Sequence, residues 1–194
     1  MALLDILKQL NWLDFFVVIL LLRVGYVSVK NGLPLELFKF IGIVSAVYIS
    51  LHYYTALSDL LYKRFMPKSM PLEFTDFVVF LLLITAGYLG FVGLRSVLFR
   101  FVQLNAVPRI NQVAGLILGI FRGFLVVGLI SFTLAISTVH YFTNSVRHSY
   151  LGRRAITISP RTYDWLWGNI FSKFLSQEKY NATISEAISK LNQK

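Results

Sequence analysis

The stretch FVVFLLLITAGYLGFVGL, residues 77–94, decides the fold class of this chain. It contains no charged side chain, and its length comes close to the roughly 20 apolar residues with which a helix crosses the hydrocarbon core of a bilayer. Asp76 opens the stretch, and apolar residues continue beyond Arg95. The pattern predicts a transmembrane helix over about 76–99.

Three further apolar runs have the same character and lie at about 12–29, 37–57 and 111–139. The sequence Asn31-Gly32-Leu33-Pro34 separates the first two, because glycine and proline mark the end of one helix and the start of the next. Residues 58–75, which contain two prolines, predict a loop. The fold class is therefore all-α, a polytopic membrane helical bundle of about four transmembrane helices within residues 1–145.

The composition favours lipid as the surroundings of this chain. Hydrophobic residues make up 56% of it and charged residues only 14%, which is more apolar surface than a soluble domain of this size can bury. The formal net charge is +10, and the basic residues flank the apolar runs. This pattern indicates anionic lipid headgroups, and not nucleic acid, as the partner. The absence of cysteine excludes disulfides and thiolate metal sites.

Residues 146–194 form a basic tail with an amphipathic helix from Ser159 onward. Apolar residues recur there at three- and four-residue spacing, and Ser159-Pro160 offers an N-cap and a first-turn proline. We expect this helix to lie on the membrane surface, and the alternative is that its apolar stripe packs against the end of the bundle. The residues expected at the interface are Trp165, Trp167, Arg153, Arg154 and Arg161.

Regularly spaced glycines predict where the helices pack against each other. In lipid, helices associate through close backbone contact, which small residues permit. The clearest pattern is Gly115, Gly119 and Gly123, at four-residue spacing in the fourth run. A ligand groove is the other use of such glycines. The corresponding small residues of the second and third runs are Gly42, Ala46, Ser50, Gly87, Gly90 and Gly93.

Arg122 is a charged side chain inside an apolar run. A guanidinium near the bilayer centre costs about 2.5–3.5 kcal/mol and therefore requires a partner. Asp14 and Asp76, the carboxylates assigned to apolar spans, are the predicted candidates for an intramembrane pair with Arg122. In the alternative interpretation the fourth crossing begins at Gly123, Arg122 reaches the interface, and residues 111–121 form a shallow or re-entrant piece.

No pattern in the sequence indicates an enzyme. His52, His140 and His148 are dispersed and lack the spacing of a metal site. The sequence contains no nucleophile elbow, zinc-protease helix, phosphate loop or dinucleotide fingerprint. We expect no catalytic residue, no bound metal and no cofactor.

The segment from Ile110 to Gly115, followed by Gly119 and Phe121-Arg122-Gly123, resembles the glycine-rich fourth helix of the colicin V production protein (CvpA) family. The first run is similar to the opening helix of that family, through Asn11-Trp12-Leu13-Asp14, Gly25 and Lys30-Asn31-Gly32. The chain has Asn31 where relatives commonly have arginine. The resemblance covers residues 10–172 and carries over Asp14, Gly25, Gly32, Gly115, Gly119, Arg122 and Gly123, none with a catalytic role.

The resemblance implies a multi-pass bacterial inner-membrane protein that is linked to production or export of the toxin colicin V and to envelope function. Together with the residues it predicts a non-enzymatic scaffold or accessory protein. Its partners would be lipid, a second copy of the chain, or an envelope or secretion protein. The alternative is a small transporter or channel subunit in which Arg122 and Asp14 or Asp76 line a polar path. Basic residues are more frequent on the side of both termini, so we expect both termini in the cytoplasm.

Overall fold

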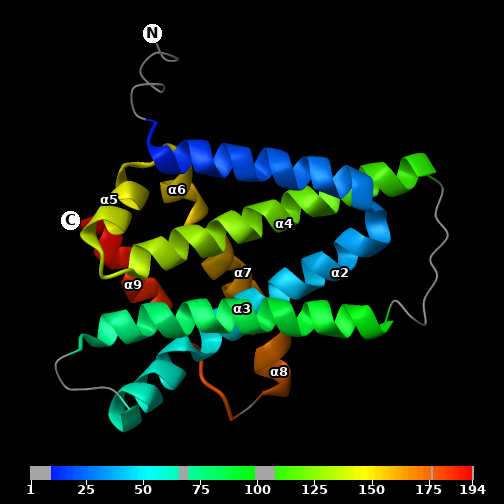
Figure 1. Cartoon of the computed structure of the whole chain (residues 1–194). Helices are drawn as coiled ribbons and strands as arrows, with labels where there is room; N and C mark the ends of the chain where they lie inside the picture. Colours follow the sequence, from blue (N-terminus) through cyan, green and yellow to red (C-terminus); the bar gives the residue numbers. More distant parts are fainter. Residues whose placement is uncertain (1–9, 66–69, 99–107, 176, 194) are drawn as a thin grey trace.

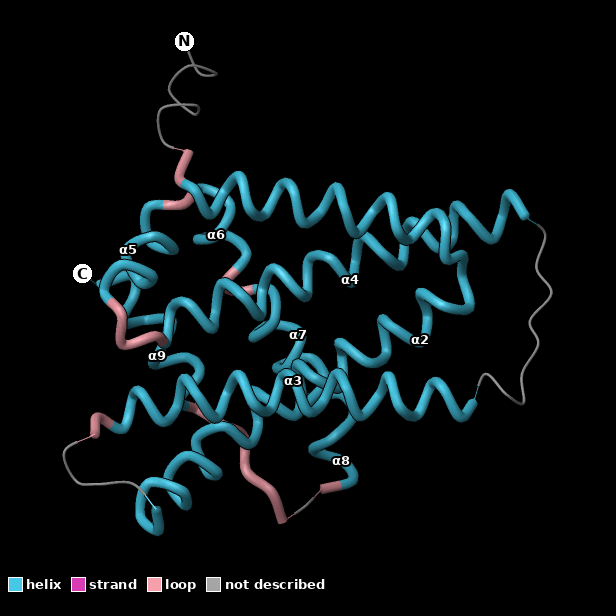
Figure 2. Tube along the Cα trace, viewed as in Figure 1, coloured by secondary structure: helices cyan, strands magenta, loops and turns pink. Residues whose placement is uncertain are grey.

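The computed structural model describes residues 10–65, 70–98, 108–175 and 177–193. Every regular element in these ranges is a helix, which confirms the all-α prediction (Figure 2). Three of the helices are long and apolar enough to cross a membrane. The number of crossings, about four by sequence, stays a prediction.

The first long helix, α2, runs from Trp12 to Phe65 and is broken at Gly32. Gly32 has a φ of 73° and a ψ of 175°, a backbone conformation that a side chain disfavours. Pro34 follows in the first turn of the second arm, where its missing N–H group costs little. The two arms run in different directions from this bend (Figure 1). The prediction of a break at Asn31-Gly32-Leu33-Pro34 agrees with this geometry.

The other long helices are α3, Leu72–Leu98, and α4, Pro108–Ile136. Both pack mainly against α2, and the bend of α2, the end of α3 and the start of α4 lie toward one end of the bundle (Figure 1). In the core, the Phe80 ring of α3 lies 5.4 Å from the Tyr54 ring of α2 and 5.2 Å from the Phe132 ring of α4. These aromatic contacts hold the three helices together near the opposite end.

Two predicted boundaries differ from the structure. Residues 58–65, assigned to a loop, continue α2 as helix, and residues 70–71 precede α3. Residues 66–69, with Pro67, and residues 99–107 lie outside the described part of the chain. Residues 111–121 belong to the unbroken helix α4, so the shallow or re-entrant interpretation of this segment does not describe the structure.

The predicted helix from Ser159 onward corresponds to one continuous helical run, made of α7 (Ile158–Leu166), the π-helical turn η1 (Trp167–Phe171) and α8 (Ser172–Phe174). The short helices α5 (His140–His148) and α6 (Tyr150–Ala155) precede this run, and α9 (Thr183–Gln193) follows it. Helix α7 has Thr157 at its N-cap, not Ser159, whose hydroxyl donates to the Leu125 carbonyl of α4. Tyr163 and Leu166 are buried against the bundle. The packing alternative therefore describes these two residues, whereas Phe174 is 80% exposed.

Candidate functional site at the bend of α2

Glu36 and Arg122 form an ion pair inside the bundle. Glu36 lies one turn after the break in α2 and is fully buried, and Arg122 projects from the middle of α4. The Arg122 Nε atom is 3.1 Å from the Glu36 Oε2 atom. The N–H group does not point at the oxygen closely enough for a hydrogen bond, so the contact is an ion pair governed by distance. It places opposite charges together where the surrounding helices exclude water.

Two further side chains complete the surroundings of the Glu36 carboxylate. The Asn31 amide donates a hydrogen bond of 2.6 Å to Oε1, and the Lys39 ammonium lies 3.1 Å from the same oxygen. Glu36 therefore has one cation on each oxygen, Lys39 on one and Arg122 on the other. One carboxylate cannot neutralise both, and this cluster retains a surplus positive charge.

Asn111 of α4 binds directly to the break in α2. The Leu33 N–H group, freed by the interruption at Gly32, donates a hydrogen bond of 2.6 Å to the Asn111 side-chain oxygen. The first N–H groups of a helix lack partners within that helix, and a buried site has to satisfy them by other means. Any side chain on Gly32 would collide with Asn111. The bend and α4 thus fit together through one amide side chain.

The glycines of α4 bring it into backbone contact with the first arm of α2. A Cβ atom on Gly115 would lie 2.7 Å from the Gly32 carbonyl carbon and 2.9 Å from the Ser28 carbonyl oxygen. A Cβ atom on Gly119 would overlap the Ser28 side chain, and one on Gly123 would meet Leu21 at 3.0 Å. This approach is what allows Arg122, on the same helix, to reach Glu36.

The other predicted packing residues divide into two groups. A Cβ atom on Gly87 of α3 would lie 3.1 Å from the Ala46 Cα atom of α2, and Gly42 faces the Phe91 ring. Ser50 is fully buried and donates to the Val47 carbonyl. Among the described residues, no atom lies within 4 Å of a Cβ position on Gly90 or Gly93. Neither glycine therefore packs against another described helix.

The hypothesised partner of Arg122 was wrong. Arg122 pairs with Glu36, and neither Asp14 nor Asp76 contacts it. The Asp14 carboxylate accepts hydrogen bonds from Ser149 Oγ and the Leu151 N–H group, both at 2.7 Å, and so connects α2 with the start of α6. Asp76 lies at the other end of the bundle near Ser58. Glu36 was detectable as the one carboxylate within the apolar sequence LPLELF of residues 33–38.

The predicted interfacial residues of the tail also divide. Trp165 is 60% exposed, and the three arginines at 153, 154 and 161 are exposed. Trp167 instead stacks on His52 of α2 with ring centres 5.1 Å apart. The His52 ring also contacts the Tyr163 hydroxyl at 2.9 Å and Glu178 at 2.8 Å. Burial raises the pKa of the Tyr163 phenol, which keeps it neutral in this contact.

One comparison with known proteins gives a match that spans the residues of this site. A family model described as colicin V production protein matches residues 13–160, which include Asp14, the bend at Gly32, Glu36 and the glycines of α4. No curated protein and no solved structure matches the chain. The match covers well over half of the sequence and confirms the resemblance of the first and fourth runs. The chain belongs to the colicin V production protein family.

Proposed function

We propose that this protein is a non-enzymatic scaffold or accessory protein of the bacterial inner membrane, with a part in toxin production or export and in envelope function. The observation that carries the proposal is the close fit between α2 and α4. Glu36 pairs with Arg122, Asn111 accepts the hydrogen bond of the freed Leu33 N–H group, and backbone fills the space beside Gly115. Polar and charged groups that bond to one another within the bundle support an architectural role.

The proposed topology has four crossings, because each arm of α2 is long enough to traverse the hydrocarbon on its own. Both termini then lie on the cytoplasmic side, which the excess of basic residues near that end supports. The proposed partners are anionic lipid headgroups and either a second copy of the chain or an envelope or secretion protein. The apolar surface of α3, with Leu82 60% and Leu89 58% exposed, supports contact with lipid or another helix.

A small transporter or channel subunit is the second candidate. The observation that favours it is the pair of opposite charges at Glu36 and Arg122, since ionisable residues within a membrane bundle commonly mark an ion or substrate path. In that role the pair would separate when the path opens. Asp14 and Asp76 would not line this path, because they lie away from Arg122.

Thiol accessibility distinguishes the two functions, and the chain is suited to it because it has no native cysteine. Leu118 and Val126 lie one turn before and one turn after Arg122, on the same face of α4. The scaffold predicts that Leu118→Cys and Val126→Cys do not react with a membrane-impermeant thiol reagent in intact vesicles. Arg109→Cys, an exposed position at the start of α4, is the reactive control. Reaction of the cysteines at positions 118 and 126 at the rate of the control would overturn the scaffold and support a water-filled path.

A further inference from the structure

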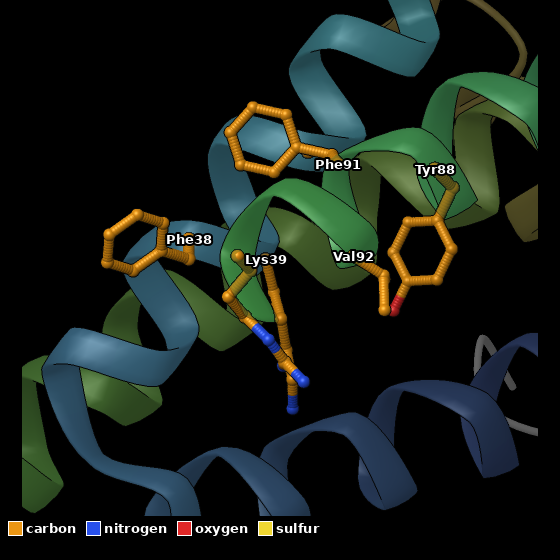
Figure 3. Close-up of a pocket in the computed structure, with 7 residues that line it drawn as sticks. Phe38, Lys39, Tyr88, Phe91 and Val92 are labelled. Atoms are coloured by element: carbon orange, nitrogen blue, oxygen red, sulfur yellow. The ribbon is translucent and has the colours of Figure 1, made fainter. Parts of the chain in front are cut away.

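A shallow groove lies between the second arm of α2 and α3 (Figure 3). It encloses little space of its own and is partly open to the outside. The Phe91 side chain packs directly against Gly42, with its Cδ1 atom 3.1 Å from the position of a Cβ atom on that glycine. The apolar wall is formed by Phe38, Gly42, Tyr88, Phe91 and Val92.

Two cations, Lys39 and Arg95, line the same groove. Lys39 shares the Glu36 carboxylate with Arg122, and Arg95 has no ion pair with any residue that the structure describes. Three positive charges therefore stand against one negative charge in this neighbourhood. Glu36 is also the only acidic residue in the sequence between Asp14 and Asp59. The groove lacks an anion that would balance its cations.

The position of the groove relates it to a membrane surface. Arg95 lies within one turn of the end of α3, and Lys39 lies two turns after the bend of α2. These two ends occur at the same end of the bundle (Figure 1). Tyr88 lies two turns before Arg95 along α3, so the apolar wall extends from the two cations toward the middle of the helices. Positive charge at headgroup depth followed by an apolar wall matches the two parts of a phospholipid.

We propose that this groove binds one anionic phospholipid, with its phosphate between Lys39 and Arg95 and an acyl chain along the apolar wall. The open shape of the groove supports this kind of occupant, because sites for small molecules enclose most of the surface of their ligand. A ligand held here keeps most of its surface outside the groove, as a lipid does. The inference rests on the proposed membrane placement and is independent of the scaffold role.

Native mass spectrometry of the full-length chain in detergent tests the site. The protein is titrated with phosphatidylglycerol and, separately, with phosphatidylcholine of the same acyl chains. We expect a one-to-one complex with phosphatidylglycerol that Arg95→Gln weakens about fivefold, the factor for about 1 kcal/mol per basic residue beside anionic lipid. Arg109→Gln is the matched control, because Arg109 is exposed at the same end and does not line the groove. The control variant should bind as the unchanged protein does.

Three results would overturn the lipid site. They are equal binding of phosphatidylcholine, equal loss in Arg95→Gln and Arg109→Gln, and displacement of the lipid by millimolar glycerol phosphate. The last result would assign the cations to a free phosphate compound. Helix content measured by circular dichroism must stay unchanged in Arg95→Gln, and Lys39→Gln should weaken binding in the same direction. A failed lipid site leaves the thiol-accessibility result untouched, so the two proposals fail separately.

Discussion

At the scale of single residues, the contact between Glu36 and Arg122 explains how a charged side chain lies inside an apolar bundle. A guanidinium in hydrocarbon costs about 2.5–3.5 kcal/mol, and a carboxylate at 3.1 Å offsets this cost because few water molecules screen the attraction. Lys39 on the other carboxylate oxygen adds to the attraction. The carboxylate is therefore shared, and removing it leaves both cations unbalanced.

We predict that Glu36→Gln lowers the free energy of unfolding by about 3–5 kcal/mol, the range for breaking one side of a buried ion pair. Arg122→Gln should also destabilise, and the double variant should cost less than the sum of the two single changes by about 0.5–3 kcal/mol. Mixed-micelle unfolding followed by circular dichroism measures these values. Glu73→Gln, at an exposed position in the first turn of α3, is the control and should change little. Strictly additive effects would show that the pair contributes no coupling.

Gly115 provides a second test at this scale. We predict that Gly115→Ala destabilises the bundle by about 1–3 kcal/mol, because the new methyl group meets the backbone of Gly32 and Ser28, which cannot rotate away. Gly90→Ala is the matched control, since nothing lies within 4 Å of its Cβ position in the described structure. That change should be neutral or gain about 0.5–1 kcal/mol from helix propensity. Equal effects of the two substitutions in the same unfolding assay would contradict the packing argument.

The sequence identified Arg122 but not its partner, and the reason is geometric. Asp14 and Asp76 lie in apolar runs as Arg122 does, so composition alone favoured them. Which carboxylate reaches Arg122 depends on where α2 bends and how closely α4 approaches it. The bend at Gly32 turns Glu36 toward α4, and the contact of Gly115 with Gly32 brings Arg122 within reach. Neither the bend nor the contact of Gly115 with Gly32 can be deduced from the residues next to Arg122 in the sequence.

At the scale of elements, the start of α2 holds the tail through Asp14. The carboxylate accepts hydrogen bonds from Ser149 and Leu151 at the beginning of α6, and it is 1% exposed. An anion at this position satisfies N–H groups that a helix start leaves without partners. Asp14 was predicted as a member of an intramembrane pair, and the structure gives it this capping contact instead.

We predict that Asp14→Asn loosens α6 by about 1 kcal/mol, the usual cost of losing a good cap, because the amide keeps one acceptor oxygen and loses the charge. The hydrogen-exchange rates of the backbone amides of residues 150–152 should rise several-fold, because losing that free energy makes local opening of α6 more frequent. Asp59→Asn, at an exposed position of α2, should leave the exchange of these amides unchanged. An unchanged exchange rate in Asp14→Asn would mean that the cap does not hold α6.

Elements with a strong local signal were predicted well, and the helix from Ser159 onward is among them, but its contacts with the bundle were not predicted. The break at Gly32 follows from glycine and proline, which restrict the backbone locally. Helix α2 nevertheless continues through residues 58–65, because polar residues at the end of a membrane helix need not end it. Tyr163 and Trp167 of this helical run contact His52 of α2, a residue distant from them in the sequence. Periodicity within the tail carries no information on that partner.

At the scale of the whole molecule, the fold class could be predicted because hydrocarbon imposes one requirement on every span. A long apolar segment in lipid must satisfy its backbone internally, and a helix does so without partners. The arrangement of the helices needed the structure, since glycine spacing shows which face packs but not which helix it meets. Gly87 meets Ala46, while Gly90 and Gly93, at the same spacing, meet no described neighbour.

The proposed topology depends on the two arms of α2 crossing the membrane in opposite directions from the bend at Gly32. Single cysteines at Lys30, Asp59 and Thr138, all exposed positions, test it by labelling with an impermeant thiol reagent in right-side-out and inverted vesicles. We predict that Lys30→Cys reacts from the periplasmic face, and that Asp59→Cys and Thr138→Cys react from the cytoplasmic face. Labelling of Lys30→Cys and Asp59→Cys from the same face would rule this topology out.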